Sequence, residues 1–233
     1  MPCLEVKLSL FISFEGGEGS GKTTQTKRLK KTLSEKTSCE IVALREPGST
    51  PLGDYLREWL KNETQSSLPN ITELLLFAAA RSILVENVIK PSLEKPNAIV
   101  ITDRYSDSTT AYQGYGRQLP LKDLRNINDL STQGLVPSLT FLLDCSPEES
   151  LTRIDSLMNN KKTKNPSRID KKGTRRFEEE SIEFHERVRN GYLATAKTSP
   201  NRWIIVDATL SENDIASMVW RHVKNKLDFF GMK

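Results

Sequence analysis

Five short apolar runs are spaced along the chain and are separated by longer segments in which apolar and polar residues mix. The runs are LSLFISF (8–14), EIVAL (40–44), NAIVITD (97–103), LTFLLD (139–144) and RWIIVDA (202–208). They do not alternate strictly between apolar and polar positions, which is typical of strands covered on both faces. The pattern therefore predicts an α/β fold with a five-stranded parallel sheet flanked by helices.

The segments between these runs carry helical signals. Residues 25–36, QTKRLKKTLSEK, repeat apolar positions at the spacing of an amphipathic helix. Further along, Asn70 and Glu73 resemble a capping box, which predicts a helix that starts there and continues to about residue 89. Pro91 is expected to end that helix, because proline lacks the N–H group that a helix interior needs.

The glycine-rich stretch FEGGEGSGKTTQ (14–25) lies between a strand-like run and a helical pattern. Its spacing, Gly16-x-x-x-x-Gly21-Lys22-Thr23, is that of the loop that binds nucleotide phosphates. Glycine lets backbone N–H groups turn inward around an anion, and the following helix adds its positive end. In such a loop Lys22 supplies a cation for the β and γ phosphates, and the Thr23 hydroxyl is a Mg²⁺ ligand. The residues expected to bind the phosphates of ATP are Gly16, Gly17, Glu18, Gly19, Ser20, Gly21, Lys22, Thr23 and Thr24.

Composition narrows the class of protein further. With 233 residues, one such loop and no linker, the chain is expected to be a single domain over residues 1–233. The formal net charge of +4 suits phosphorylated substrates and does not require a nucleic-acid partner. No secretory signal and no membrane-spanning apolar stretch is evident, and the three cysteines lack metal-binding or redox spacing. We therefore expect a cytoplasmic protein without a nucleic-acid or membrane partner.

One segment is far more basic than the rest. Residues 161–176, KKTKNPSRIDKKGTRR, carry eight basic side chains against one acidic side chain. Such a run is either a solvated charged loop or, in a protein that handles phosphates, a mobile lid over them. We expect a mobile basic lid at about 159–177.

A phosphate-binding loop alone does not distinguish a kinase from a switch GTPase. The two short motifs of guanine-nucleotide-binding proteins occur here as Asp170-Lys-Lys-Gly173 and Asn225-Lys-Leu-Asp228. Neither follows a predicted strand, so we interpret both as chance matches.

Polar residues also follow the other predicted strands, at the edge of the sheet where open α/β folds bind ligands. Arg45 follows the second run in a segment rich in proline and glycine. Asp103 ends the third run, at the usual place of a carboxylate associated with Mg²⁺. Both residues are therefore candidates for the site.

Two groups of helical residues suit recognition of a base. Phe77 and Arg81 are four residues apart and share a helix face, so a ring is next to a cation. Thr109, Tyr112 and Gln113 are spaced so that three polar groups point one way. On the residues alone, ordinary core packing explains Phe77 slightly better than base stacking does.

These segments together resemble the thymidylate kinases of the bacterial type, which have the P-loop nucleoside monophosphate kinase fold. The matching segments are FEGGEGSGKTTQ, REPGSTPLGDYLR (45–57), LLLFAAAR (74–81), DRYSDSTTAYQG (103–114), PSLTFLLDCSPEESLTR (137–153) and FEEESIEFHERVRNGYL (177–193). They occur in the family's order from about residue 9 to 208. The resemblance implies transfer of the ATP γ-phosphate to dTMP, giving dTDP and ADP with Mg²⁺, a step of dTTP biosynthesis that supplies DNA synthesis.

The resemblance also implies roles at the dTMP site. Phe77 stacks on thymine, and Arg81 bonds the base edge or the monophosphate. Thr109 and Gln113 lie where the family contacts the base. The whole set implied for dTMP is Glu18, Arg45, Phe77, Arg81, Arg104, Thr109, Tyr112 and Gln113.

Three of these residues serve the sugar and the phosphates by resemblance. Tyr112 crowds the 2′ face of the sugar and so favours deoxyribose, and Glu18 contacts the 3′-hydroxyl. Arg104 lies between the acceptor phosphate and the γ-phosphate. Thr23 and Asp103 are the residues implied for Mg²⁺.

Phosphoryl transfer needs positioning and charge neutralisation more than a general base. Some members of the family carry a basic residue inside the phosphate loop, whereas this loop carries Glu18. The basic segment is therefore expected to supply that cation, from Arg168, Arg175 or Arg176, because a planar guanidinium holds two phosphate oxygens. Arg175 replaces an aspartate that is frequent in relatives, which leaves its role open. The expected catalytic residues are Lys22, Arg104, Arg168 and Arg176.

Two alternatives keep the phosphate loop but change the function. One is a kinase for another monophosphate such as UMP or dUMP, since one methyl group is worth only about 1–3 kcal/mol in an apolar pocket. The other is a P-loop ATPase that binds nucleic acid through the basic segment, although that segment lacks interleaved aromatic residues.

The resemblance further implies a homodimer and places Arg153 and residues 207–209 near adenine.

Overall fold

The computed structural model describes residues 9–62, 68–164, 177 and 180–232. The strands are β1 (Leu10–Glu15), β2 (Glu40–Arg45), β3 (Ala98–Asp103), β4 (Leu139–Asp144) and β5 (Trp203–Asp207). All strand pairs are parallel, and the order across the sheet is β2-β3-β1-β4-β5. The predicted five-stranded parallel sheet is therefore confirmed.

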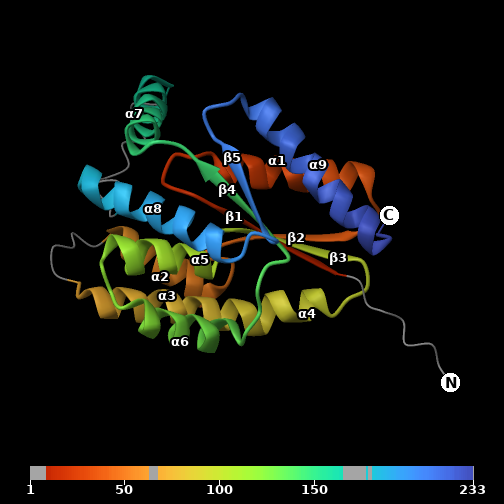
Figure 1. Ribbon diagram of the computed structural model, residues 1–233, viewed down its shortest axis with the longest axis horizontal. Coiled ribbons are helices and arrows are strands. Elements are labelled where there is room, and N and C mark those ends of the chain that lie inside the picture. The colour runs from red at the N-terminus through yellow and green to blue at the C-terminus, as the bar shows by residue number, and fades with distance from the viewer. Residues whose placement is uncertain (1–8, 63–67, 165–176, 178–179, 233) are drawn as a thin grey trace.

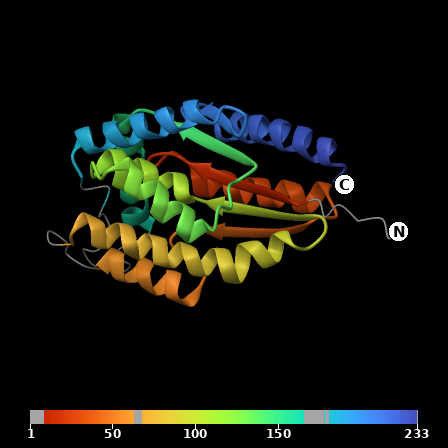
Figure 2. The same cartoon turned by 60° about the horizontal axis from the view of Figure 1, so that its bottom comes forward.

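Helices lie on both faces of the sheet, as the parallel arrangement requires (Figures 1 and 2). The α-helices are α1 (Lys22–Lys36), α2 (Pro51–Asn62), α3 (Asn70–Leu84), α4 (Lys90–Leu93), α5 (Ser106–Thr109), α6 (Leu121–Thr132), α7 (Pro147–Lys164), α8 (Ile182–Thr198) and α9 (Glu212–Phe230). Two segments are π-helices, η1 (Val85–Ile89) and η2 (Thr110–Gly116). Among these helices, none is long and apolar enough to cross a membrane.

The two faces of the sheet have separate cores, because side chains of a strand alternate between faces. Leu10, Ile12 and Phe14 of β1 pack with Leu29 of α1 and Val219 of α9, all at most 3% exposed. On the opposite face, the strands contact the helical layer built from α3, η1, η2 and α8 (Figure 2). The chain between Glu15 and Lys22 joins β1 to α1 at the carboxyl end of the sheet.

The helix predicted to end at Pro91 does not end there. It continues from α3 through η1 into α4, and Pro91 lies in the first turn of α4. The π turn before Pro91 shifts the register of backbone hydrogen bonds, so that the missing N–H of Pro91 falls where the register changes.

The predicted capping box at the start of α3 is also wrong. The N-cap position is occupied by Pro69, and Asn70 is the first helical residue. The Glu73 side chain is buried and accepts hydrogen bonds from Gln113 and Arg117. The Glu73 carboxylate therefore bonds side chains far away in the sequence, and it does not cap the start of α3 as the local pattern predicts.

Because the strands are parallel, their carboxyl ends meet at one edge of the sheet. Every strand ends in a charged residue at this edge, namely Glu15, Arg45, Asp103, Asp144 and Asp207. Residues that follow these ends in sequence build the site described next.

Candidate active site

The loop between β1 and α1 has the backbone shape of a phosphate-binding loop. Gly16 has φ 140°, and a Cβ there would lie 2.5 Å from the Leu143 carbonyl oxygen. Gly21, with φ 94°, is the N-cap of α1. Only glycine adopts these conformations without strain, so the loop directs backbone N–H groups at the start of α1 toward one point.

Lys22 lies in the first turn of α1 and folds back over the loop. Its Nζ donates hydrogen bonds to the Gly17 carbonyl oxygen at 2.5 Å and to the Ser20 hydroxyl at 3.2 Å. Burial and the charge of Arg104 lower the pKa of Lys22 to about 8, although Glu18 opposes this. A phosphate bound in the loop would place negative charge next to Lys22 and so favour its protonated, positively charged form.

Thr23 and Asp103 provide the oxygen atoms that suit a magnesium ion. The Thr23 hydroxyl donates to Asp103 Oδ2 at 2.5 Å, joining the first turn of α1 to the end of β3. Hydroxyl and carboxylate oxygens are hard ligands, and Mg²⁺ takes few of them because phosphates and water complete its shell. No group of three or more acidic, histidine or cysteine side chains able to hold a metal occurs among the described residues.

Arg104 is held between the phosphate loop and the residues beyond it. Its backbone has φ 71°, which is rare for a residue with a Cβ. Nη1 donates to the Gly16 carbonyl oxygen at 3.0 Å, and Nη2 donates to Glu18 Oε1 at 2.7 Å and to the Tyr112 hydroxyl at 3.0 Å. The Arg104 guanidinium therefore contacts both the phosphate loop, at Gly16 and Glu18, and Tyr112 of η2.

Glu18 is the acidic partner of this arginine. Burial alone would raise the pKa of Glu18, but the charges of Arg104 and Lys22 outweigh burial and lower it. The Tyr112 hydroxyl also donates to Glu18 Oε1 at 3.0 Å. Glu18 is thus an ionised acceptor within the phosphate loop.

A second carboxyl group, Glu15, lies beneath Arg104 and is 0% exposed. It accepts hydrogen bonds from the Tyr105 backbone N–H at 2.8 Å and from the hydroxyls of Ser108 at 2.6 Å and Tyr192 at 3.1 Å. Both hydroxyls also lie 3.2 Å from Arg104 Nη1. Burial and the charge of Asp107 raise the pKa of Glu15 to about 8.

A cavity of about 200 Å³ opens next to Arg104. Its lining combines apolar walls with charged and amide groups: Glu18, Glu46, Pro47, Arg57, Leu60, Phe77, Ala80, Arg81, Arg104, Tyr105, Ser108, Thr109, Tyr112, Gln113 and Phe177. A pocket with apolar walls and a few convergent polar groups suits a small organic ligand. Seven of the eight residues predicted for the acceptor are brought together here, and Arg45 is the exception.

Arg81 forms the polar floor of this cavity and is 3% exposed. Its Nε donates to Glu46 Oε2 at 2.8 Å, and its Nη2 donates to the Thr109 hydroxyl at 2.9 Å. Burial raises the pKa of Glu46 even though Arg81 opposes it. The guanidinium therefore has a fixed orientation within the protein itself.

Phe77 is half-buried on the cavity wall and does not lie in the closed core. Its ring faces the ring of Phe177, with 6.3 Å between centroids and an interplanar angle of 29°. Phe177 in turn meets the Tyr112 ring edge-on at 4.9 Å. The three rings give the cavity flat apolar surfaces.

Arg45 and Arg57 are placed differently from the sequence expectation. Arg45 is an exposed residue outside the cavity lining, and its Nη2 lies 3.9 Å from Asp54 Oδ1. Arg57, on α2, lines the cavity and donates to the Pro47 carbonyl oxygen at 3.1 Å. Both arginines occur in REPGSTPLGDYLR, so this segment was recognised while its cavity-facing residue was missed.

Some predicted residues lie outside the described part of the chain. These are Arg168, Arg175 and Arg176, with most of the segment predicted as a lid at about 159–177. The guanine-type match at 170–173 lies there too, and the match at 225–228 lies within α9. Of the predicted lid, the structure gives the end of α7 and Phe177.

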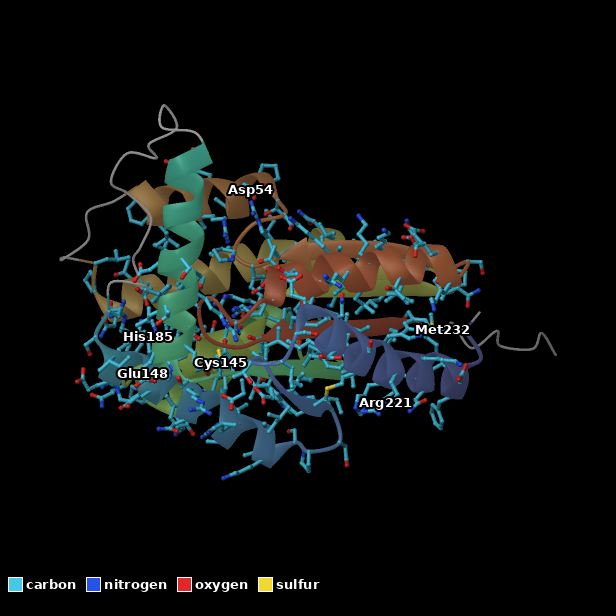
Figure 3. All side chains as sticks on the ribbon, turned by 90° about the horizontal axis from the view of Figure 1, so that it is seen from above. Asp54, Cys145, Glu148, His185, Arg221 and Met232 are labelled. Atoms are coloured by element: carbon cyan, nitrogen blue, oxygen red, sulfur yellow. The ribbon has the colours of Figure 1, made fainter. Side chains whose placement is uncertain are left out.

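The two elements expected near adenine are in contact. Arg153 Nη1, on α7, donates to the Ala208 carbonyl oxygen at 2.7 Å. Figure 3 shows Cys145, Glu148 and His185 around the beginning of α7, far from Arg221 and Met232 at the other end of the molecule. The α7 helix and the turn after β5 thus flank the phosphate loop.

Sequence reasoning missed several residues of the site: Glu15, Arg57, Glu73, Tyr105, Ser108, Arg117 and Tyr192. Most of them contact a residue that was predicted, but they do not belong to a sequence motif that would identify them. Glu15 had a visible signal, since a carboxylate ends the apolar run immediately before the glycine-rich loop. The others depend on pairings across the fold.

Comparisons with known proteins agree with this arrangement. A family model described as Thymidylate kinase matches residues 14–219. The thymidylate kinase of Dehalococcoides mccartyi is 44% identical over 216 residues, 93% of this chain and 96% of that protein. That of Geotalea daltonii is 43% identical over 223 residues, 95% of this chain and 99% of that protein. The crystal structure of thymidylate kinase from Ehrlichia chaffeensis has a TM-score of 0.71 and 33% identity, covering 93% of this chain and 98% of that one.

Proposed function

This chain belongs to the thymidylate kinase family and transfers the γ-phosphate of ATP to dTMP, and we propose how its side chains carry out that reaction. The observation that carries the proposal is the position of Arg104. Its guanidinium bonds the Gly16 carbonyl oxygen in the phosphate loop and, at the same time, Glu18 and Tyr112 on the cavity wall. A donor phosphate in the loop and an acceptor phosphate in the cavity would both meet this one cation.

The phosphate chain of ATP binds along the loop from Gly16 to Thr24. Backbone N–H groups and the start of α1 face the phosphates, and Lys22 leaves the Gly17 carbonyl oxygen to bond them. Thr23 and Asp103 would hold Mg²⁺, which would neutralise part of the phosphate charge when bound. The adenine lies between α7 and the turn after β5, next to Arg153.

The nucleoside of dTMP binds in the cavity of about 200 Å³. Phe77 stacks on thymine, while Arg81, Thr109 and Gln113 face the base edge. On the sugar, Tyr112 crowds the 2′ position, and Glu18 accepts a hydrogen bond from the 3′-hydroxyl. The acceptor phosphate then points toward Arg104.

Transfer needs no general base, because the acceptor phosphate is already a nucleophile at neutral pH. An oxygen of dTMP forms a bond to the γ-phosphorus while the bond from that phosphorus to the bridging oxygen breaks, leaving ADP and dTDP. Lys22 and Arg104 stabilise the charge that develops on the transferred group. Arg57 adds a cation at the cavity wall, whereas Arg45 lies outside the cavity lining. The cation expected on the far side of the γ-phosphate would come from Arg168 or Arg176, which lie outside the described residues.

We also propose that the protein acts as a homodimer. Ile71 and Leu75 on α3 are 48% and 51% exposed, and Leu130 on the neighbouring α6 is 80% exposed. Exposed apolar side chains on two helices that pack together suit burial against a second copy of the chain. Sedimentation of the chain should give twice the monomer mass, and Leu130→Glu should shift it toward the monomer.

The direct test of the reaction is ADP release from Mg·ATP with dTMP, dUMP, UMP, CMP, GMP or AMP as acceptor. We expect dTMP to give the highest kcat/KM and release without acceptor to be negligible. ADP release that ignores every monophosphate would overturn the proposal and favour a P-loop ATPase instead.

A further inference from the structure

The amide of Gln113 is held in one orientation by a buried carboxylate. Gln113 Nε2 donates to Glu73 Oε1 at 2.8 Å, and the two residues are 2% and 0% exposed. An ionised carboxylate has only acceptors, so the amide nitrogen must be the end that faces it. The carbonyl oxygen Oε1 is then the opposite end of an amide that lines the cavity.

Arg117 holds Glu73 from the other side. Its Nε lies 3.3 Å from Glu73 Oε1, and its Nη2 lies 3.3 Å from Glu73 Oε2. Nη1 donates to Glu180 Oε1 at 2.5 Å. We call Glu73, Gln113, Arg117 and Glu180 the Arg117 cluster.

Aromatic rings fix the position of the guanidinium in this cluster. Its central carbon lies 4.9 Å from the centroid of the Phe184 ring and 5.6 Å from that of Phe177. Gly116, just before Arg117, allows this approach, because a Cβ there would lie 2.6 Å from the Phe184 ring. Burial alone would lower the pKa of Arg117, but Glu73 and Glu180 outweigh it and raise the pKa.

We propose that Arg117 is a positioning residue for base selection: it keeps the Glu73 carboxylate in place, so that Gln113 presents its carbonyl oxygen to the base. This inference rests on the proposed binding of dTMP in the cavity. A carbonyl oxygen accepts a hydrogen bond from the N3–H of thymine or uracil. Cytosine carries an acceptor at N3, so it would face the oxygen with no hydrogen between them.

Rotation of the amide does not rescue cytosine while the cluster is intact. Turning Gln113 over would place its carbonyl oxygen against the carboxylate of Glu73, two acceptors without a proton. Without Arg117, Glu73 loses the hydrogen bonds that it accepts from Nε and Nη2 of that guanidinium, and its carboxylate is no longer held against Gln113. A displaced Glu73 permits either orientation of the amide, and selectivity against cytosine falls.

Four variants test this assignment. Arg117→Met keeps the length of the side chain and removes its charge and donors, and Arg117→Lys keeps the charge but cannot reach both Glu73 and Glu180 in the same way. Glu73→Gln keeps the size of the side chain but replaces one acceptor oxygen by a donor, so it permits both orientations of Gln113 while losing a hydrogen bond from Arg117. Arg187→Met is the matched control, because Arg187 lies 6.0 Å from the same Phe184 ring and donates to the Gly116 carbonyl oxygen without contacting Glu73 in the described structure.

The measurement is kcat/KM for dTMP and for dCMP, with dissociation constants for both from calorimetry. We expect the ratio of dTMP to dCMP to fall about 10-fold or more in Arg117→Met and in Glu73→Gln, mainly through KM and Kd. Arg187→Met should leave the ratio unchanged. Circular dichroism identifies a variant that does not fold, and Arg117→Lys or Glu73→Gln then decides.

Two outcomes overturn different parts of the account. If the unsubstituted chain neither binds nor phosphorylates dTMP, the proposed function and this inference fail together. If it phosphorylates dTMP and the folded variants keep the original ratio of dTMP to dCMP, the proposed function stands and Arg117 has no role in base selection. An equal loss in Arg187→Met would show a packing effect and would also overturn the inference.

Discussion

At the base end of the cavity, Arg81 and Arg117 each face a buried carboxylate, whereas at the phosphate end Lys22 and Arg104 share Glu18 as a partner. Glu46 and Glu73, the partners at the base end, are 6% and 0% exposed. Their pairing compensates both cations and fixes that end before any ligand arrives. At the phosphate end two cations share one carboxylate, and the other carboxylate beside them, Asp103, is the one proposed for Mg²⁺.

The base end and the phosphate end of the site therefore recognise different parts of the substrates in different ways. A base is uncharged, so it is recognised best by donors and acceptors already oriented in the free protein. Phosphates bring charge with them, and cations that are only partly compensated gain most when the phosphates bind. Changes at the base end should affect stability, KM and selectivity, while changes at the phosphate end should affect kcat.

The largest effect is expected for Lys22→Met. Within the described part of the chain, its amine bonds the Gly17 carbonyl oxygen and the Ser20 hydroxyl, which it can exchange for phosphate oxygens. Loss of this cation should lower kcat by about 10²–10³-fold. Steady-state kinetics with saturating ATP and dTMP measures the change, and a kcat within threefold of the unsubstituted protein would break the distinction between the ends.

A smaller and different effect is expected for Arg81→Leu at the base end. Removing this partner leaves Glu46 buried without its cation and should cost about 3–5 kcal/mol of unfolding free energy. Arg28→Leu is the control, because its pair with Glu212 is 39% and 65% exposed and is worth about 0–1 kcal/mol. Urea unfolding measures both, and equal losses in the two variants would contradict the account.

The effect expected at Glu15 is spread over several pH units, so it is the smallest for any one pH unit. The folded protein holds a proton on Glu15 up to a pKa of about 8, whereas the unfolded chain loses it near 4.5. The unfolding free energy should therefore fall as pH rises through this interval, by at most about 1.4 kcal/mol per pH unit from this group. Glu15→Gln should remove that part of the slope, so identical slopes from urea unfolding in both proteins would place the pKa of Glu15 at its ordinary value.

The sheet and the phosphate loop could be predicted from the sequence because their signals are local. Apolar runs give the strands, and glycine spacing followed by Lys22 gives the loop. The contact of Thr23 with Asp103 also follows, since parallel strands end at one edge and both residues lie just there.

The residues that hold the site together could not be predicted in this way. Glu73 follows Asn70 at the spacing of a capping box, and nothing nearby indicates that its partner is Arg117, 44 positions away. Likewise, Arg45 and Arg57 lie in one short segment, and only the placement of α2 decides which of them faces the cavity. Local sequence patterns identify the reactive and ligand-binding side chains. The residues that orient these side chains are brought to them by the fold, so they cannot be identified from local patterns.

The central claim, that one cation joins the two substrates, is tested most directly by the kinetics of Arg104→Lys. Lysine keeps the charge but cannot bond Gly16, Glu18 and Tyr112 together. We expect kcat to fall by about 10²-fold, with KM for ATP and dTMP changing far less. A variant that keeps its kcat and loses only affinity for one substrate would contradict the claim.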